Sequence, residues 1–393
     1  MIFITRSALY QEYNWNNPLK HITDYIINRD IRNRDIFYWD GVEQLQVPFS
    51  GQYFSDTYKK YWPDFFELLV TRNINIFAVG GDINTHDELP QHPNLIIFRW
   101  KTALLHFIHH SMTTQYNNPN TNINPTFTKL FSCLNRHPRQ ERIMLVDSLY
   151  RDGLFEHGDV SWNTLVNEWE ENPPINFKYW PEKRLRVDLF PKKIYTGYGP
   201  PVEELLPDGL VRKPDEDGYY IRDYQLLTDY VLNTNCLFNL ACESVPLSHE
   251  NTCFITEKTW KPILLGQPSI ILGNYWYKKH MEDMGFKFYD NIIDYSFYGN
   301  ANEYQHFPDL IPMLTKELSK FKNKNYQELY ESIKDIVRHN RSRAYQILNN
   351  DPYISDEFVA FYNKHRNSWD DEECSELRVD IDIHRVFKNK IYT

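Results

Sequence analysis

The chain has 393 residues, enough for two domains of ordinary size, and its hydrophobic content of 41% excludes a disordered protein. The formal net charge of −10 argues against a surface built to grip duplex DNA, because such surfaces carry a basic stripe. No run approaches the roughly 18 to 20 apolar residues of a membrane-spanning helix, and the N-terminus is charged too soon for a signal peptide. Five scattered cysteines without a C-x-x-C pair indicate free thiols, so we expect a cytoplasmic protein.

The first part of the chain, residues 1–120, alternates between strand and helix signals. Apolar runs predict strands at 2–5, 36–39, 74–79 and 95–98, and apolar residues at helical spacing predict helices at 58–71 and 102–110. This alternation predicts a Rossmann-like α/β domain. The polar stretch 117–125, N-N-P-N-T-N-I-N-P, has turn formers and no apolar period, so we place the domain boundary within it.

The second part, residues 121–350, is predicted to form another Rossmann-like domain. A strand at 129–135 and a helix at 139–151 open it, and prolines make 152–225 irregular. Further elements are predicted as a helix at 223–232, a helix at 275–284, a strand at 285–289 that extends the sheet, and helices at 308–321 and 326–348. We expect residues 351–393 to form a tail that packs back on the fold.

The stretch Cys236–Gly273 reads as strand, helix, strand, which is a parallel β-α-β unit. Thr256 is a natural N-cap for the helix, and the carboxylate of Glu257 suits its first turn. Gly266 supplies the end of the helix. The N-terminus of such a helix is where open α/β sheets bind phosphates. Lys258 is therefore placed to meet a diphosphate, and Glu257 to accept hydrogen bonds from ribose hydroxyls.

At these residues the chain resembles a known family. E-S, followed by F-I-T-E-K-T-W-K-P-I-L-L-G-Q-P-S-I-I-L-G, resembles the donor-binding signature of the α-1,3-fucosyltransferases, glycosyltransferase family ten. That family shows E-N-S, then Y-x-T-E-K-L-W-x-N-A-L and a turn into V-P-V-V-L-G. This chain departs from it at 261–263, K-P-I, and at 267–269, Q-P-S. The departures lie next to the expected donor pocket and leave the identity of the sugar open.

The resemblance implies a fold and an activity. The fold is GT-B, with two Rossmann-like domains facing each other across a cleft. The activity is inverting, metal-independent transfer of a sugar, with GDP-fucose as the expected donor and a glycan hydroxyl as the acceptor. No cofactor is expected. Two alternatives stay open: a virus-encoded transferase that acts on modified DNA bases, and a non-catalytic nucleotide- or glycan-binding protein of the same fold.

Candidates for binding the donor come from two segments. The resemblance implies that Glu257 and Lys258 bind the nucleotide, and Thr256 and Asn251 lie close to them in sequence. Arg142 and Arg139 belong to the second segment, the predicted helix 139–151, because a guanidinium grips phosphate with two hydrogen bonds. The structural alternative is that Glu257 and Lys258 are ordinary first-turn residues and that the arginines lie on a solvated helix face.

Candidates for catalysis are carboxylates, because an inverting transfer needs a base for the acceptor hydroxyl. Glu243 ends the central strand at the edge that faces ligands, and the resemblance places a glutamate there. Asp82 and Glu88 follow a predicted strand of the first domain, where each is otherwise a solvated loop acid. No metal site is predicted: His106, His109 and His110 recur at helical spacing without a nearby set of carboxylates or cysteines.

Overall fold

The structure is a computed structural model in which the described residues are 2–5, 18–39, 61–80, 92–102, 104–106, 108–109, 126–135, 140–161, 236–243, 255–273, 277–298 and 307–365. The chain divides into two compact units. The first comprises Met1–Ser111, Ser248–Glu257 and Gln346–Thr393, and the second comprises Met112–Leu247 and Lys258–Tyr345. Within the described residues, each unit contains one four-stranded sheet with parallel strands, which confirms the predicted α/β class.

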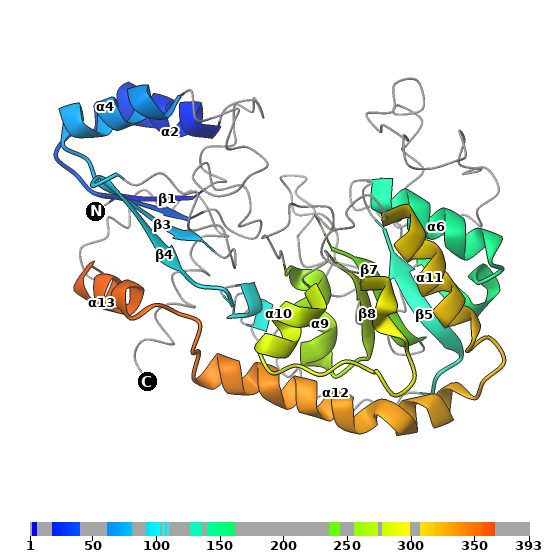
Figure 1. Ribbon diagram of the computed structural model, residues 1–393. Coiled ribbons are helices and arrows are strands. Elements are labelled where there is room, and N and C mark those ends of the chain that lie inside the picture. The colour runs from blue at the N-terminus through cyan, green and yellow to red at the C-terminus, as the bar shows by residue number, and fades with distance from the viewer. Residues whose placement is uncertain are drawn as a thin grey trace, which may run out of the picture. The chain divides into compact units, whose positions relative to one another are not determined.

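The sheet of the first unit places its strands in the order in which the chain makes them. They are β1 (Ile2–Thr5), β2 (Ile36–Trp39), β3 (Ile76–Gly80) and β4 (Leu95–Arg99). Helix α2 (Pro18–Asn28) lies between β1 and β2 in the chain, and α4 (Trp62–Arg72) lies between β2 and β3. Figure 1 shows α2 and α4 on one face of this sheet and α13 (Asp356–His365) on the other.

Both faces of the first sheet are covered by apolar side chains. Ile36 and Tyr38 of β2 belong to the core beneath α2 and α4. Phe37, between them, points to the other face, where its ring lies 6.1 Å from that of Phe358 and 5.9 Å from that of Phe361. A parallel strand buried on both faces is apolar throughout, which is why these strands read as short continuous apolar runs.

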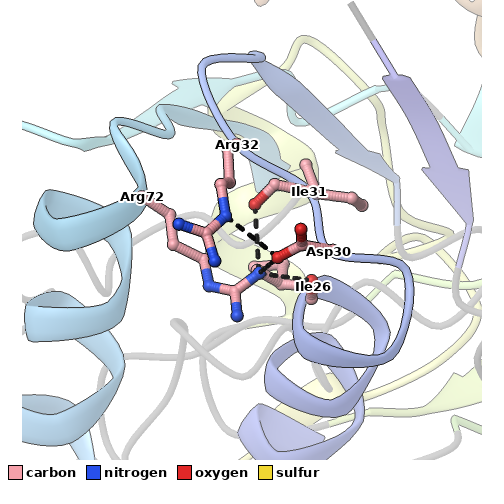
Figure 2. Close-up of polar contacts among 5 residues, drawn as sticks. All are labelled: Ile26, Asp30, Ile31, Arg32 and Arg72. Atoms are coloured by element: carbon pink, nitrogen blue, oxygen red, sulfur yellow. Dashed lines mark hydrogen bonds and ion pairs between the residues drawn. The ribbon is translucent and has the colours of Figure 1, made fainter.

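The ends of α2 and α4 are tied together by arginine side chains (Figure 2). Arg72, the last residue of α4, donates from Nη1 to the carbonyl oxygens of Ile26 (3.2 Å) and Ile31 (3.4 Å) and to Asp30 Oδ1 (3.1 Å). Arg32 Nε also donates to Asp30 Oδ1, at 2.9 Å. The hydrogen bond and charge of Arg32, with those of Arg72, hold the pKa of Asp30 below its usual value. Arg72 thus satisfies carbonyls at the end of α2.

The sheet of the second unit has the strand order β6-β5-β7-β8. The described helices and strands of this unit are β5 (Lys129–Leu134), α6 (Gln140–Arg151), a 3-10 turn η4 (Phe155–His157), β6 (Gly158–Ser161), β7 (Cys236–Cys242), α9 (Glu257–Leu265), β8 (Ser269–Leu272), α10 (Tyr277–Asp283), the 3-10 turn η8 (Tyr295–Tyr298), α11 (Phe307–Ser319) and α12 (Tyr326–Asn349). Glu257 at the start of α9 and the last four residues of α12 are grouped with the first unit. Helices α6 and α11 lie side by side (Figure 1).

Strand β6 was not predicted from the sequence. It is only four residues long, G-D-V-S, and it carries a single apolar side chain, Val160. Gly158 is required because a Cβ there would lie 2.4 Å from the ring of Phe131 on β5. The strand is therefore specified by the neighbour it packs on rather than by its own pattern.

The strand predicted at Gly285–Tyr289 is wrong, because this segment has no regular structure and β8 is the last described strand of the sheet. Phe286 and Tyr289 are buried, which accounts for the strand-like pattern. The backbone of Lys287 pairs instead with the side chain of Asn340 on α12: Lys287 N donates to Oδ1 and Nδ2 donates to Lys287 O, both at 2.8 Å. A side-chain amide therefore takes the place of a strand partner.

The helices in the described part of the chain include none that is both long and apolar enough to span a bilayer.

Candidate functional site

The carboxyl ends of three neighbouring strands meet at one edge of the second sheet. β5 pairs with β7, and β7 with β8, all parallel, so Asn135, Glu243 and Gly273 each follow directly on a strand end at that edge. The β7–β8 ladder continues one residue further, with Glu243 N donating to Leu272 O at 3.0 Å. Ligands in open parallel sheets bind outside this edge. We define the candidate site as this carboxyl edge with the first turns of α9 and α6.

Helix α9 starts as the sequence predicted. Thr256 immediately precedes it and is buried, whereas Glu257 and Lys258, its first two residues, are half-buried. Gly266 ends it with a positive φ of 71°. Every side chain from Thr259 to Leu265 is buried, so the helix is fixed by the core around it. Its first N–H groups and the positive end of its dipole lie at the carboxyl edge, where an anion is favoured.

Glu243 is held by a hydroxyl from α9. Its side chain is 1% exposed, and Oε1 accepts a hydrogen bond from Thr259 Oγ1 at 2.5 Å. Thr259 Oγ1 also lies 3.0 Å from the hydroxyl of Tyr277, the first residue of α10. A carboxylate buried in this way links the end of β7 to the start of α9.

Arg142 lies in the first turn of α6 and is only 6% exposed, so the solvated-face alternative does not apply to it. Its positive charge lies near Cys133 of β5. Burial raises the pKa of the Cys133 thiol to about 11. A hydrogen bond from Asn135 Nδ2 (3.3 Å) and the charge of Arg142 lower this pKa, but their effect is smaller than that of burial. A guanidinium buried beside a strand end is suited to grip an anion there.

Sequence reasoning missed three residues of α9 and its surroundings. Thr259 and Tyr277 form the hydroxyl chain to Glu243, and Lys261 is a buried lysine within the helix. Lys261 stands in the K-P-I departure from the family pattern, and a charged residue within a stretch of buried neighbours was the available signal. Trp260 is fully buried, with its ring 5.7 Å from that of Phe286, so it belongs to the core.

Four predicted site residues lie outside the described residues: Asp82, Glu88, Arg139 and Asn251. The structure therefore describes Glu243, Thr256, Glu257, Lys258 and Arg142 of the predicted set. It brings one of them, Glu243, into contact with α9, through Thr259.

The predicted helical histidines include one with a carboxylate partner that sequence spacing did not reveal. His106 Nε2 lies 2.7 Å from Asp351 Oδ2, and both side chains are buried in the first unit. The two residues are 245 positions apart in the sequence. Among the described residues, no three His, Cys, Asp or Glu side chains are grouped so that they could hold a metal ion.

Comparisons of the chain with protein-family models, with curated proteins and with solved structures gave no match.

Proposed function

We propose that the chain is an inverting glycosyltransferase that takes its sugar from a nucleotide-diphosphate donor. One observation carries the proposal: the sequence T-E-K starts a helix between two parallel strands, at the edge where sheets of this kind bind ligands. Lys258 at that helix start and the buried Arg142 after the neighbouring strand are two cations suited to a diphosphate. The resemblance to family ten makes GDP-fucose the first donor to test.

The proposed reaction assigns a task to each group. The acceptor oxygen attacks the anomeric carbon from the face opposite the diphosphate, so the new C–O bond forms as the bond to the phosphate oxygen breaks, and the configuration inverts. A carboxylate removes the acceptor proton, with Asp82 and Glu88 as the candidates. The charge that grows on the leaving diphosphate is stabilised by Lys258, by Arg142 and by the N–H groups at the start of α9.

The proposal includes a GT-B architecture, metal-independent transfer and a glycan acceptor. Two units with parallel sheets support the architecture. Two cations at the donor edge take the part that a metal plays in other transferases, which supports metal independence. The net charge of −10 favours a glycan hydroxyl over a base in duplex DNA.

The test is calorimetric titration of the full chain with GDP, UDP and ADP, with EDTA or with Mg²⁺. We expect GDP to bind. At a hundred times its Kd, GDP should also raise the free energy of unfolding by about 2.7 kcal/mol, which thermal unfolding measures. Lys258→Ala should weaken binding about 10- to 100-fold, as expected for a lost charged hydrogen bond. Lys279→Ala is the control, because Lys279 is an exposed lysine on α10. The proposal fails if no nucleotide binds.

Turnover then separates an enzyme from a binding protein of the same fold. GDP release from GDP-fucose is measured with a panel of glycan acceptors and with single-stranded DNA that contains hydroxymethylated bases. Release that depends on a glycan supports the proposal, and release that depends on DNA moves the assignment to the base-modifying alternative. Tight GDP binding without release under any condition supports the non-catalytic alternative.

A further inference from the structure

A chain of two hydroxyl groups ends on the carboxylate of Glu243. The Thr259 hydroxyl has one proton and donates it to Glu243 Oε1 at 2.5 Å, so the contact of 3.0 Å with Tyr277 must have the tyrosine as its donor. The order is therefore Tyr277 O–H to Thr259 Oγ1, and Thr259 O–H to Glu243. All three side chains are buried, where hydrogen bonds to an ionised group are strong and losing one is costly.

The three residues come from three segments that meet at the carboxyl edge of the second sheet. Glu243 follows β7, Thr259 is the third residue of α9, and Tyr277 opens α10 after β8. The ring of Tyr277 lies directly against Gly273, where a Cβ would approach Tyr277 Cγ to 2.6 Å. The glycine at the end of β8 thus lets the tyrosine come close enough to reach Thr259.

The position of Thr259 explains what this chain can do for α9. Helix first turns are the part most prone to fraying, and residues in an α-helix are spaced about 100° apart around its axis. Thr259 directly follows Lys258, so a hydrogen bond that fixes Thr259 also fixes the direction in which Lys258 and Glu257 leave the helix. The family pattern has leucine after T-E-K where this chain has Thr259. The hydroxyl is therefore a feature of this chain and not of the signature it resembles.

We propose that Glu243 and Thr259 are positioning residues for the nucleotide: the carboxylate holds the first turn of α9 through the threonine hydroxyl and so sets the direction of Lys258 toward the diphosphate. Glu243 acts through Thr259, since a carboxylate that is 1% exposed does not meet an acceptor hydroxyl. The inference rests on the proposed nucleotide site.

The test compares isosteric variants by calorimetric titration with GDP. Thr259→Val removes the hydroxyl and keeps the shape of the side chain, whereas Thr259→Ser keeps the hydroxyl and removes only the methyl group. Thr315→Val is the matched control, because Thr315 is a fully buried helix threonine of the same unit whose hydroxyl donates only to Pro312 O of its own helix, at 3.2 Å. Thermal unfolding of each variant is measured alongside.

We expect Thr259→Val to raise the Kd for GDP up to about tenfold, because binding must then order the first turn of α9 and the energy of the lost charged hydrogen bond sets the limit of that cost. Thr315→Val should leave the Kd for GDP within about twofold, even if its Tm falls as much as that of Thr259→Val. Thr259→Ser, which keeps a hydroxyl, should keep most of the wild-type affinity. A wild-type Kd in Thr259→Val, whatever its Tm, overturns the positioning role and leaves the nucleotide site intact. Absence of GDP, UDP and ADP binding to the wild-type chain overturns the proposed function and the positioning role with it.

Discussion

Each of the two units buries a carboxylate that accepts a threonine hydroxyl at 2.5 Å. In the first unit, Asp351 Oδ2 accepts from Thr102 at that distance and from Trp100 Nε1 at 2.9 Å, and it lies 2.7 Å from His106 Nε2. Asp351 Oδ1 accepts from the backbone N–H of Tyr353 at 2.9 Å. In the second unit, Glu243 accepts from Thr259.

The difference between these two carboxylates lies in what they hold. Asp351 ties the segment after β4 to a segment some 245 residues later in the chain, just before α13 packs on the first sheet. Glu243 ties a strand end to a helix that starts 14 residues later, at the carboxyl edge of the sheet, where we propose that the nucleotide binds. A buried carboxylate thus joins distant segments of the chain in one unit and, in our proposal, fixes the orientation of the first turn of α9 in the other.

The largest effect is expected from Asp351→Ala. Burial raises the pKa of Asp351, and the hydrogen bonds of Thr102, Trp100 and the Tyr353 amide oppose that rise, so the carboxyl depends on these donors. Asp351→Ala leaves the Trp100 indole, the Thr102 hydroxyl and the Tyr353 amide without their acceptor, and at about 1–3 kcal/mol for each buried unsatisfied group we expect a loss of about 3–5 kcal/mol. Urea unfolding followed by tryptophan fluorescence measures the loss. Asp335→Ala is the control, because Asp335 pairs with Arg338 at the surface and should cost at most about 1 kcal/mol. A loss for Asp351→Ala as small as that of the control would contradict the anchoring role.

A smaller effect is expected from Thr102→Val, the counterpart of Thr259→Val in the other unit. Asp351 Oδ2 keeps the Trp100 donor and its contact with His106 in this variant, so we expect a loss of unfolding free energy of about 1–2 kcal/mol. Urea unfolding measures it, and titration with GDP should give the wild-type Kd. Equal losses of GDP affinity in Thr102→Val and Thr259→Val would show that the hydroxyls act only through overall stability, and the contrast between the units would disappear.

Much of the fold could be predicted from the sequence because both sheets are parallel and buried. Short apolar runs bounded by polar or glycine residues marked β1 to β5 with boundaries within two residues, and the predicted β-α-β stretch Cys236–Gly273 contains β7 and β8. The start and end of α9 were predictable for the same reason that they are stable: a threonine before the first turn, an acid within it, and Gly266 after the last.

The parts that could not be predicted depend on partners distant in sequence. Gly285–Tyr289 has a strand's apolar pattern, yet Asn340, 53 residues away from Lys287, takes up its backbone groups. His106 seemed to lack a carboxylate because Asp351 follows it by 245 residues. At the candidate site, Glu243 and Arg142 could be named from strand-end and helix-start positions. The burial of Arg142 and the hydroxyl of Thr259 could not, since both follow from packing.

The smallest effect is expected in the pH dependence of stability, which reports whether water reaches the buried Cys133 thiol near Arg142. Burial raises the pKa of Cys133 from 9.0 to about 11 although Asn135 and Arg142 lower it. Between these values the unfolded chain loses the thiol proton while the folded protein keeps it, so stability must fall as pH rises.

From pH 8 to pH 10, the unfolding free energy of the wild type should therefore fall by roughly 1 kcal/mol more than that of Cys133→Ala. Groups that titrate in both proteins cancel in this difference, and the cavity left by alanine adds an offset that does not change with pH. Urea unfolding at pH 8, 9 and 10 measures it. A difference independent of pH would mean that water reaches the thiol in the folded protein. The end of β5 would then be open to solvent, and water would weaken the attraction that we propose between the charge of Arg142 and a diphosphate.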